Sequence, residues 1–159
     1  MNVNIKHLML LIGASFIVSC TGSKVNRSYQ SAINGSWTLS NVTHPNNPGE
    51  YNAILFNIAN ATCYNGSTWN FVSNNSTGNY TFANPGCGTD PNYIRWSIYE
   101  PGDGSYWFQF KPIDENKNST NNNAGYRLNI LTLNENRMVL STNVQVDGNP
   151  FDLHLNFTK

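Results

Sequence analysis

The chain has 159 residues, and its nine basic and nine acidic side chains give it a formal net charge of zero. That length matches about one domain of ordinary size, so there is no room for a second catalytic lobe. No basic block could neutralise a run of phosphates, which argues against nucleic acid as a partner. Aromatic residues make up 13% of the chain. Because each of them can bury on the order of 150–250 Å², we expect a folded core and not a disordered chain.

The first 19 residues are typical of an export signal. Lys6 precedes an apolar stretch from Leu8 to Val18, and small Ser19 stands before Cys20. This stretch is much shorter than the roughly 20 residues with which a helix spans a bilayer. We therefore expect no permanent transmembrane helix here.

The segment Ile17-Val18-Ser19-Cys20 resembles the lipobox of bacterial lipoproteins. The resemblance implies cleavage before Cys20 and lipidation of that residue, which makes a membrane the partner because several acyl chains anchor a protein stably. Thr21 in the next position resembles lipoproteins sorted to the outer membrane, and the lack of an acidic run over 21–26 favours the periplasmic face. We expect a signal peptide over 1–19, a lipidated tether over 20–32 and one folded domain over 33–159.

The cysteines then form an even pair. With Cys20 carrying lipid, Cys63 and Cys87 remain in an oxidising compartment, which predicts a disulfide between them. A metal pair is the alternative, but cysteine metal sites use closer spacing and further ligands, and only His44 and His154 follow the predicted signal peptide. We expect no metal and no cofactor.

From Gln30 onward the apolar residues repeat every second position, as in strands with one wet face, and no long segment has a helical period. Turn-forming runs at 74–78, 100–104 and 134–136 predict hairpins. The expected strands are 36–43, 52–58, 68–73, 79–84, 93–100, 105–113, 125–133, 137–145 and 151–158. Segment 114–124 has no apolar residue except its final alanine and predicts a long surface loop. Short strands joined by hairpins favour a sandwich or an up-and-down barrel.

The motif Gly35-Ser36-Trp37 resembles the G-x-W signature of lipocalins. Together with the run from Cys63 to Phe71, the run 75–81 and the last three residues, it makes 33–159 look like the lipocalin-like lipoproteins of Bacteroidetes. The resemblance implies an all-β fold, an eight- to nine-stranded antiparallel up-and-down barrel with a central cavity and a short N-terminal plug. In that superfamily a cation stacks on the signature tryptophan, a part that Lys159 or Arg127 would have to take. The family's usual C-terminal helix has no counterpart, because the sequence ends at Lys159.

Two functions are compatible with these features. The first is an outer-membrane-anchored carrier of a small hydrophobic ligand, because a barrel of eight strands can hold one such molecule. The inward residues expected to serve as ligand contacts or simply as core are Trp69, Phe71, Tyr80, Phe82, Trp96, Tyr106, Phe108, Phe110 and Tyr126. The alternative is a protein-interaction module, an envelope component or an enzyme inhibitor, whose barrel is filled by its own side chains.

An enzyme is not expected. The sequence holds no phosphate-binding loop, dinucleotide glycine motif or zinc motif. A nucleophilic hydrolase needs a base that a third group orients, and His44 and His154 fit a turn and a wet strand face better. The scattered carboxylates leave a glycosidase pair open, because such pairs meet in space and not in sequence.

Overall fold

The computed structural model describes residues 23–46, 52–146 and 148–159. The predicted signal peptide and Cys20 lie outside the described residues. The elements are α1 (Lys24–Ile33), β1 (Gly35–Thr43), β2 (Ile54–Leu55), β3 (Ala59–Asn60), η1 (Ala61–Tyr64), β4 (Ser67–Val72), β5 (Thr77–Thr81), η2 (Pro85–Cys87), β6 (Asn92–Tyr99), β7 (Trp107–Ile113), β8 (Tyr126–Leu133), β9 (Arg137–Val146) and β10 (Asn149–Thr158). No helix among the described residues is long and apolar enough to cross a bilayer.

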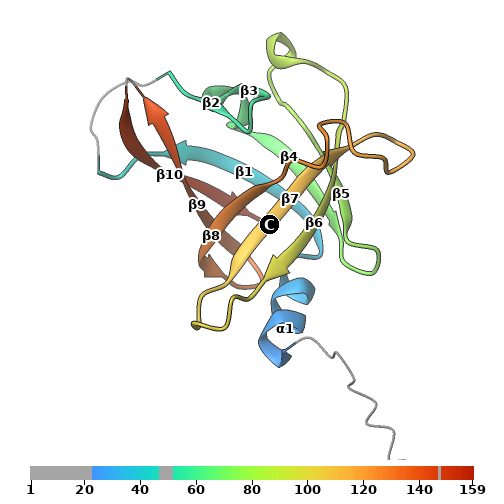
Figure 1. Ribbon diagram of the computed structural model, residues 1–159. Helices are drawn as coiled ribbons and strands as arrows, with labels where there is room; N and C mark the ends of the chain where they lie inside the picture. Colours follow the sequence, from blue (N-terminus) through green and yellow to red (C-terminus); the bar gives the residue numbers. More distant parts are fainter. Residues whose placement is uncertain (1–22, 47–51, 147) are drawn as a thin grey trace, which may run out of the picture.

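Eight strands close into one antiparallel barrel in the order β1-β10-β9-β8-β7-β6-β5-β4 (Figure 1). From β4 to β10 each strand pairs with the next in the chain, and β1 closes the ring between β4 and β10. The predicted hairpins at 74–78, 100–104 and 134–136 are confirmed as the β4–β5, β6–β7 and β8–β9 connections. The expected all-β up-and-down barrel is therefore confirmed, with eight strands. Closure leaves none of these strands as an open edge.

Side chains alternate between the interior and the outer face along the barrel strands, as the period of two predicts. In β4, for example, Ser67, Trp69 and Phe71 are buried while Thr68 and Asn70 are exposed. Within the described residues the buried polar side chains are Ser67 and Ser141, and no charged side chain is buried. The interior is therefore aromatic, aliphatic and uncharged.

The predicted strand over 52–58 is wrong. Only Ile54–Leu55 is extended, and it pairs with Ala59–Asn60 in a small sheet apart from the barrel. Phe56 and Asn57 lie between them with φ angles of 57° and 51°. Such left-handed residues turn the chain sharply, so a continuous strand cannot pass through this point.

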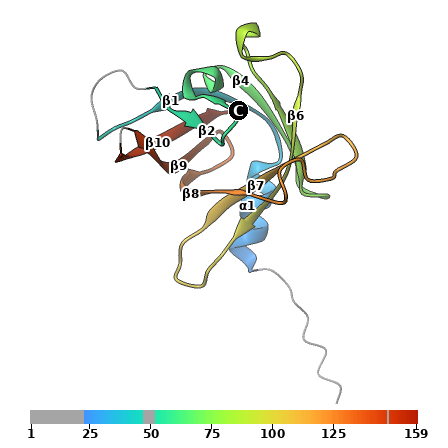
Figure 2. The same cartoon turned by 45° about the horizontal axis from the view of Figure 1, so that its top comes forward.

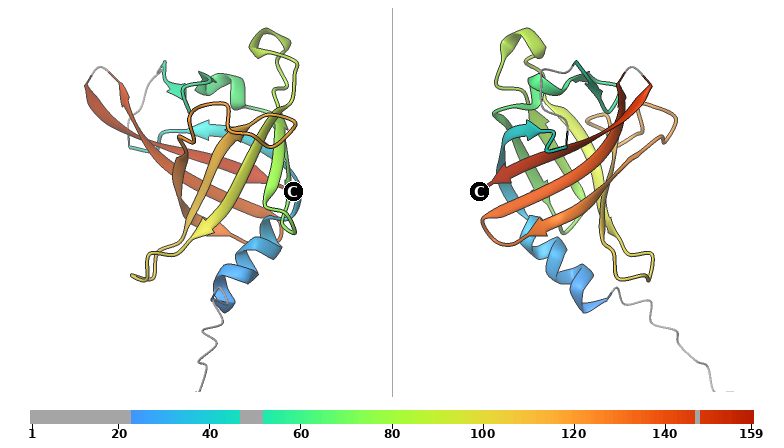
Figure 3. Two further views of the ribbon diagram at one scale, coloured as in Figure 1. Left: turned by 45° about the vertical axis from the view of Figure 1, so that its right-hand side comes forward. Right: turned by 90° about the vertical axis from the view of Figure 1, so that its left-hand side faces the viewer.

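Most of the predicted tether is helical, because residues 24–33 form α1, which the sequence did not predict. Ser23 caps this helix by accepting a hydrogen bond from the Asn26 amide at 3.0 Å. At its other end Ile33 is fully buried. Figures 1 and 3 show α1 at one end of the barrel, with β2 and β3 at the opposite end.

Candidate functional site

The barrel end beside α1 is closed by residues of the G-x-W motif. The Trp37 indole donates a hydrogen bond to the Ile33 carbonyl at 2.7 Å, and Lys159 donates to the Ala32 carbonyl at 3.1 Å. The Lys159 ammonium lies 4.9 Å from the centre of the Trp37 ring. Carbonyls at a helix C-terminus lack intrahelical partners and attract cations, so both side chains secure the end of α1.

Gly35 makes this arrangement possible. Its φ of 109° lies in the region that side chains rarely adopt, and a Cβ there would stand 3.4 Å from Cε of Lys159. Arg127, the other cation considered for this place, lies instead 4.4 Å from the centre of the Tyr99 ring on the outer face of the barrel.

The opposite barrel end is covered by residues 53–64, which we call the mouth segment. Figure 2 shows β2 across this end. Leu55 and Phe56 turn into the barrel and are 0% and 7% exposed, whereas Ile54 is 57% exposed. The Phe56 ring packs edge-on against Phe110 at 4.9 Å and tilted against Tyr126 at 5.2 Å. The Phe56 ring thus closes the barrel mouth.

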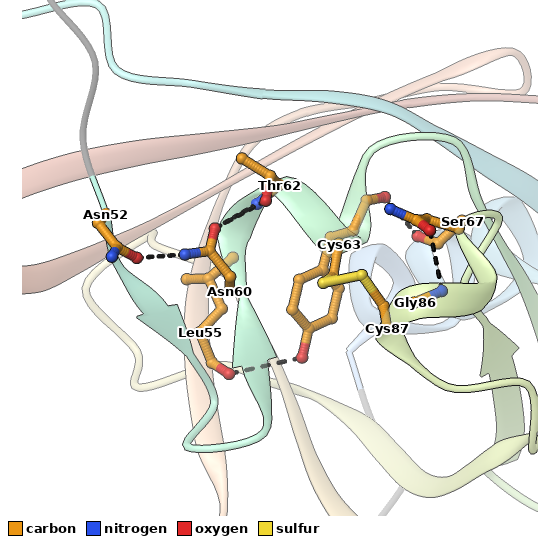
Figure 4. The surroundings of a disulfide bond; sticks show 10 residues. Asn52, Leu55, Asn60, Thr62, Cys63, Ser67, Gly86 and Cys87 are labelled. Carbon is orange, nitrogen blue, oxygen red and sulfur yellow. Dashed lines mark hydrogen bonds between the residues drawn. A yellow bond between two sulfur atoms is a disulfide. The ribbon is translucent and has the colours of Figure 1, made fainter.

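Three interactions hold the mouth segment in place, and Figure 4 shows two of them, the disulfide and the Asn60–Thr62 hydrogen bond. The predicted disulfide between Cys63 and Cys87 is confirmed, and it joins η1 to η2. The Ala61 amide donates to the Ala53 carbonyl at 2.8 Å, which closes the segment on itself. Asn60 accepts from the Thr62 amide at 3.0 Å and caps η1.

The expected inward aromatic residues fall into three groups. Tyr80, Phe82, Phe110 and Tyr126 lie at the mouth and contact Phe56 or Tyr64. Trp69, Phe71, Trp96 and Phe108 form the middle of the barrel, where neighbouring ring centres lie 5.6–6.0 Å apart. Tyr106 lies at the α1 end, with its ring 4.9 Å from that of Tyr29 and its hydroxyl bonded to Glu100. The nine residues therefore do not line a single cavity.

Sequence reasoning missed Phe56 and Tyr64 as site residues. Tyr64 is fully buried and contacts Trp69, Tyr80 and Phe82. Its position next to Cys63 was the available signal, because a disulfide that fixes Cys63 also fixes the direction of its neighbour.

Two tyrosine hydroxyls lie inside the mouth. The Tyr64 hydroxyl donates a long hydrogen bond of 3.5 Å to the Leu55 carbonyl. The Tyr80 hydroxyl oxygen is buried and has no hydrogen-bond partner at normal distance among the described residues. Burial raises the pKa of Tyr80 to about 12 and that of Tyr64 well above its ordinary value. Both groups are therefore neutral at neutral pH, and the two hydroxyls interact weakly with each other, beyond normal hydrogen-bond distance.

A cleft of about 320 Å³ opens at the rim of the mouth. Its lining includes Tyr80 and Ile94 of the barrel and Ile58 of the mouth segment, and the β7–β8 connection contributes Asp114, Glu115 and Thr120. This volume lies at the lower end of the range for small-molecule sites. Tyr80 therefore stands between the packed interior and a space open to solvent.

Other chemistry has little support among the described residues. No group of three or more His, Cys, Asp or Glu side chains could hold a metal ion there. His154 pairs with Asp152 at 3.0 Å on the wet face of β10, and both side chains are partly exposed. No nucleophile is hydrogen-bonded to that histidine.

A model of the lipocalin-like domain matches residues 33–140. The chain belongs to the lipocalin-like domain family. The lipocalin-like fold suggests a ligand-binding or carrier role and is typical of proteins that bind without catalysis. Among solved structures, the chain is similar to a lipocalin-like protein from Bacteroides uniformis, with 12% identity and a TM-score of 0.48 over 80% of this chain and 98% of that one. None of the curated proteins matches the chain.

Proposed function

We propose that this lipocalin-like protein binds a small, uncharged and mostly apolar molecule in the mouth of its barrel, where the molecule replaces the Phe56 ring. The observation that carries the proposal is the buried Tyr80 hydroxyl, which has no partner within hydrogen-bond distance among the described residues and only a weak interaction with the Tyr64 hydroxyl. The Tyr64 ring lies between Tyr80 and Phe56, which closes the mouth. A ligand with one hydrogen-bond acceptor would satisfy this donor. A buried polar group without a partner otherwise costs about 1–3 kcal/mol.

The conformation of Phe56 supports its replacement. A bulky residue with φ of 57° is an outlier, and such strain costs on the order of 1–3 kcal/mol. Withdrawal of the ring from the barrel would let the turn relax. The absence of buried charge among the described residues supports an uncharged ligand, because a buried ion without a partner costs far more than a neutral group.

The test uses the full-length protein in native membranes and an uncharged phenyl-diazirine alcohol as a photoreactive probe. We expect labels on peptides of the mouth segment and of β7 and β8, with several-fold more labelling in Phe56→Ala. The matched variant Phe56→Trp fills the same space and is expected to label less than the natural protein. Tyr80→Phe removes only the hydroxyl and is expected to weaken labelling.

Labels spread evenly over the surface would contradict the proposal. Equal labelling of Phe56→Ala, Phe56→Trp and the natural protein would contradict it as well. Partial trypsin digestion of each variant shows whether the barrel is folded, so a failure to fold is not mistaken for a failure to bind.

We also propose that Cys20 carries the lipid that anchors the protein to the outer membrane, on the periplasmic side. The lipobox-like segment before Cys20 and the Cys63–Cys87 disulfide, which requires an oxidising compartment, support this placement. Cells fed a radioactive fatty acid should label the natural protein, and Cys20→Ser should remain unlabelled. Equal labelling of both proteins would contradict the assignment.

One observation favours the alternative, a protein-interaction module. The aromatic rings are in mutual contact through the middle of the barrel, as in Trp69 stacked on Tyr80 at 4.2 Å, so this part needs no ligand to be packed. In that case photolabelling would be weak in Phe56→Ala too. Crosslinking in native membranes would then be expected to recover a specific protein partner.

A further inference from the structure

The outer face of β6, β7 and β8 carries a second candidate site, whose lining also includes Phe110 and Tyr126 of the barrel mouth. A groove of about 580 Å³ runs over these strands, which lie side by side in Figure 1. Its lining includes three cations, Arg95, Lys111 and Arg127. No acidic residue lines it, although the chain as a whole has no net charge. The volume is in the usual range for small-molecule sites.

The register of the barrel brings two of the cations face to face. Arg95 of β6 pairs directly with Lys111 of β7. Like charges at directly opposed positions of a sheet repel and are normally avoided. Neither side chain forms an ion pair with a described carboxylate, and Arg95 forms no side-chain hydrogen bond within the described residues. An anion between them would remove the repulsion.

The third cation is held in position two residues further along the sheet. Gln109 pairs with Arg127 in the barrel register, and the Arg127 guanidinium donates to the Gln109 amide oxygen at 3.4 Å. Gln109 in turn donates to the Ser97 hydroxyl at 2.9 Å. The Arg127 guanidinium also lies over the exposed Tyr99 ring. Most of its five N–H donors are still available to a ligand.

The remaining polar groups indicate what kind of anion fits. Ser97, Gln109 and Asn123 line the groove and offer hydroxyl and amide groups, and Asn123 also orients the Lys111 ammonium at 2.7 Å. Neutral amides and hydroxyls exchange hydrogen bonds with sugar hydroxyls, whereas the cations form charge-assisted bonds with carboxylates. Three cations could neutralise only a few phosphates, and the affinity of proteins for nucleic acid depends largely on the number of phosphates that they neutralise.

We propose that this outer groove binds an acidic saccharide, a short sugar chain whose units carry carboxylates. Arg95 and Lys111 bind one carboxylate, Arg127 binds a second, and the amide and hydroxyl side chains contact the sugar ring between them. Arg127 lies two residues along and one strand across from Lys111, a backbone separation of about 8 Å, which favours a ligand that repeats its charge. The site does not depend on the proposed ligand in the barrel mouth.

The test is isothermal titration calorimetry of the mature protein with trigalacturonic acid, with neutral galactotriose as the comparison ligand. Only the acidic trisaccharide is expected to bind, and its affinity should fall as salt is raised. Arg95→Gln and Lys111→Gln are each expected to weaken binding about tenfold. Arg137→Gln makes the same charge change on exposed β9 outside the groove and is expected to leave the affinity within a factor of about two.

A second readout does not need the ligand. Because Arg95 faces Lys111 without a compensating partner, Arg95→Gln is expected to raise the unfolding temperature, whereas Arg137→Gln should leave it unchanged. Equal binding of galactotriose, or no loss of affinity in Arg95→Gln and Lys111→Gln, would overturn the proposal. No binding of trigalacturonic acid but binding to phosphatidylglycerol vesicles through the same residues would also overturn it and identify a membrane contact.

Discussion

The disulfide is expected to stabilise the protein chiefly by restricting the unfolded chain. Cys63 and Cys87 are separated by 24 positions. The chain-entropy relation gives roughly 3.5 kcal/mol for a closed loop of that length at 25 °C. Both cysteines are only partly buried, so replacing them with serine should cost little in lost packing. The double variant Cys63→Ser/Cys87→Ser should therefore lose about 3 kcal/mol of unfolding free energy.

The assay is urea unfolding followed by tryptophan fluorescence, because Trp37, Trp69 and Trp96 are buried in the barrel. Adding dithiothreitol to the natural protein should give the same loss, and the double variant should not respond to it. A loss below about 1 kcal/mol in the double variant would refute the entropic reasoning. It would also mean that the mouth segment is fixed without its crosslink.

Three further predictions concern Gly78, Lys159 and the two buried tyrosines of the barrel mouth. Gly78→Ala should cost more than about 1 kcal/mol of unfolding free energy in a urea titration. The reason is that the added Cβ would lie 2.5 Å from the Asn70 carbonyl oxygen. No loss would show that β4 and β5 can separate to make room for it. Lys159→Gln should cost about 0.5–1 kcal/mol in the same assay, because it removes the cation over Trp37 at an exposed site. Its control is Lys117→Gln in the surface loop, which should cause no measurable loss of stability. Because the folded pKa of Tyr80 is raised to about 12 and that of Tyr64 is raised as well, the folded state holds these protons longer than the unfolded state. The free energy of unfolding should be unaffected below about pH 10 and fall from there towards pH 12. Absorbance at 295 nm should show both phenols still protonated at pH 10.5. Titration of all tyrosines near pH 10 would contradict the burial of these two.

The barrel could be predicted from the sequence because each of its strands carries its own pattern. Residues such as Trp69 and Phe71 alternate with polar neighbours, and the turn residues between them set the hairpins. The G-x-W motif likewise pointed to the closed barrel end, because Gly35 and Trp37 act there through local geometry and one partner, Lys159.

The mouth segment could not be predicted in the same way. Ile54, Leu55 and Phe56 form an apolar run that is typical of a strand, and only the left-handed turn at Phe56 and Asn57 makes it a cover for the barrel. That turn is imposed by packing of Phe56 on Phe110 and Tyr126, which are far away in the sequence. Helix α1 was missed because its stability depends on similar distant contacts, such as Tyr29 on Tyr106.

The cationic groove also could not be predicted from the sequence. Arg95, Lys111 and Arg127 are isolated charges in three different strands, and nothing in their spacing marks them as neighbours. Only the register of the closed barrel places Arg95 opposite Lys111 and Gln109 opposite Arg127. A site made of one residue from each of several strands becomes visible once that register is known.

Native mass spectrometry of the mature protein purified from its own host can show whether the barrel mouth binds a small molecule. We expect a defined non-covalent adduct of a small uncharged compound, released by organic solvent and absent from Phe56→Trp. A bare protein mass, with the disulfide intact and no extractable compound, would mean that the barrel is a filled scaffold and not a carrier.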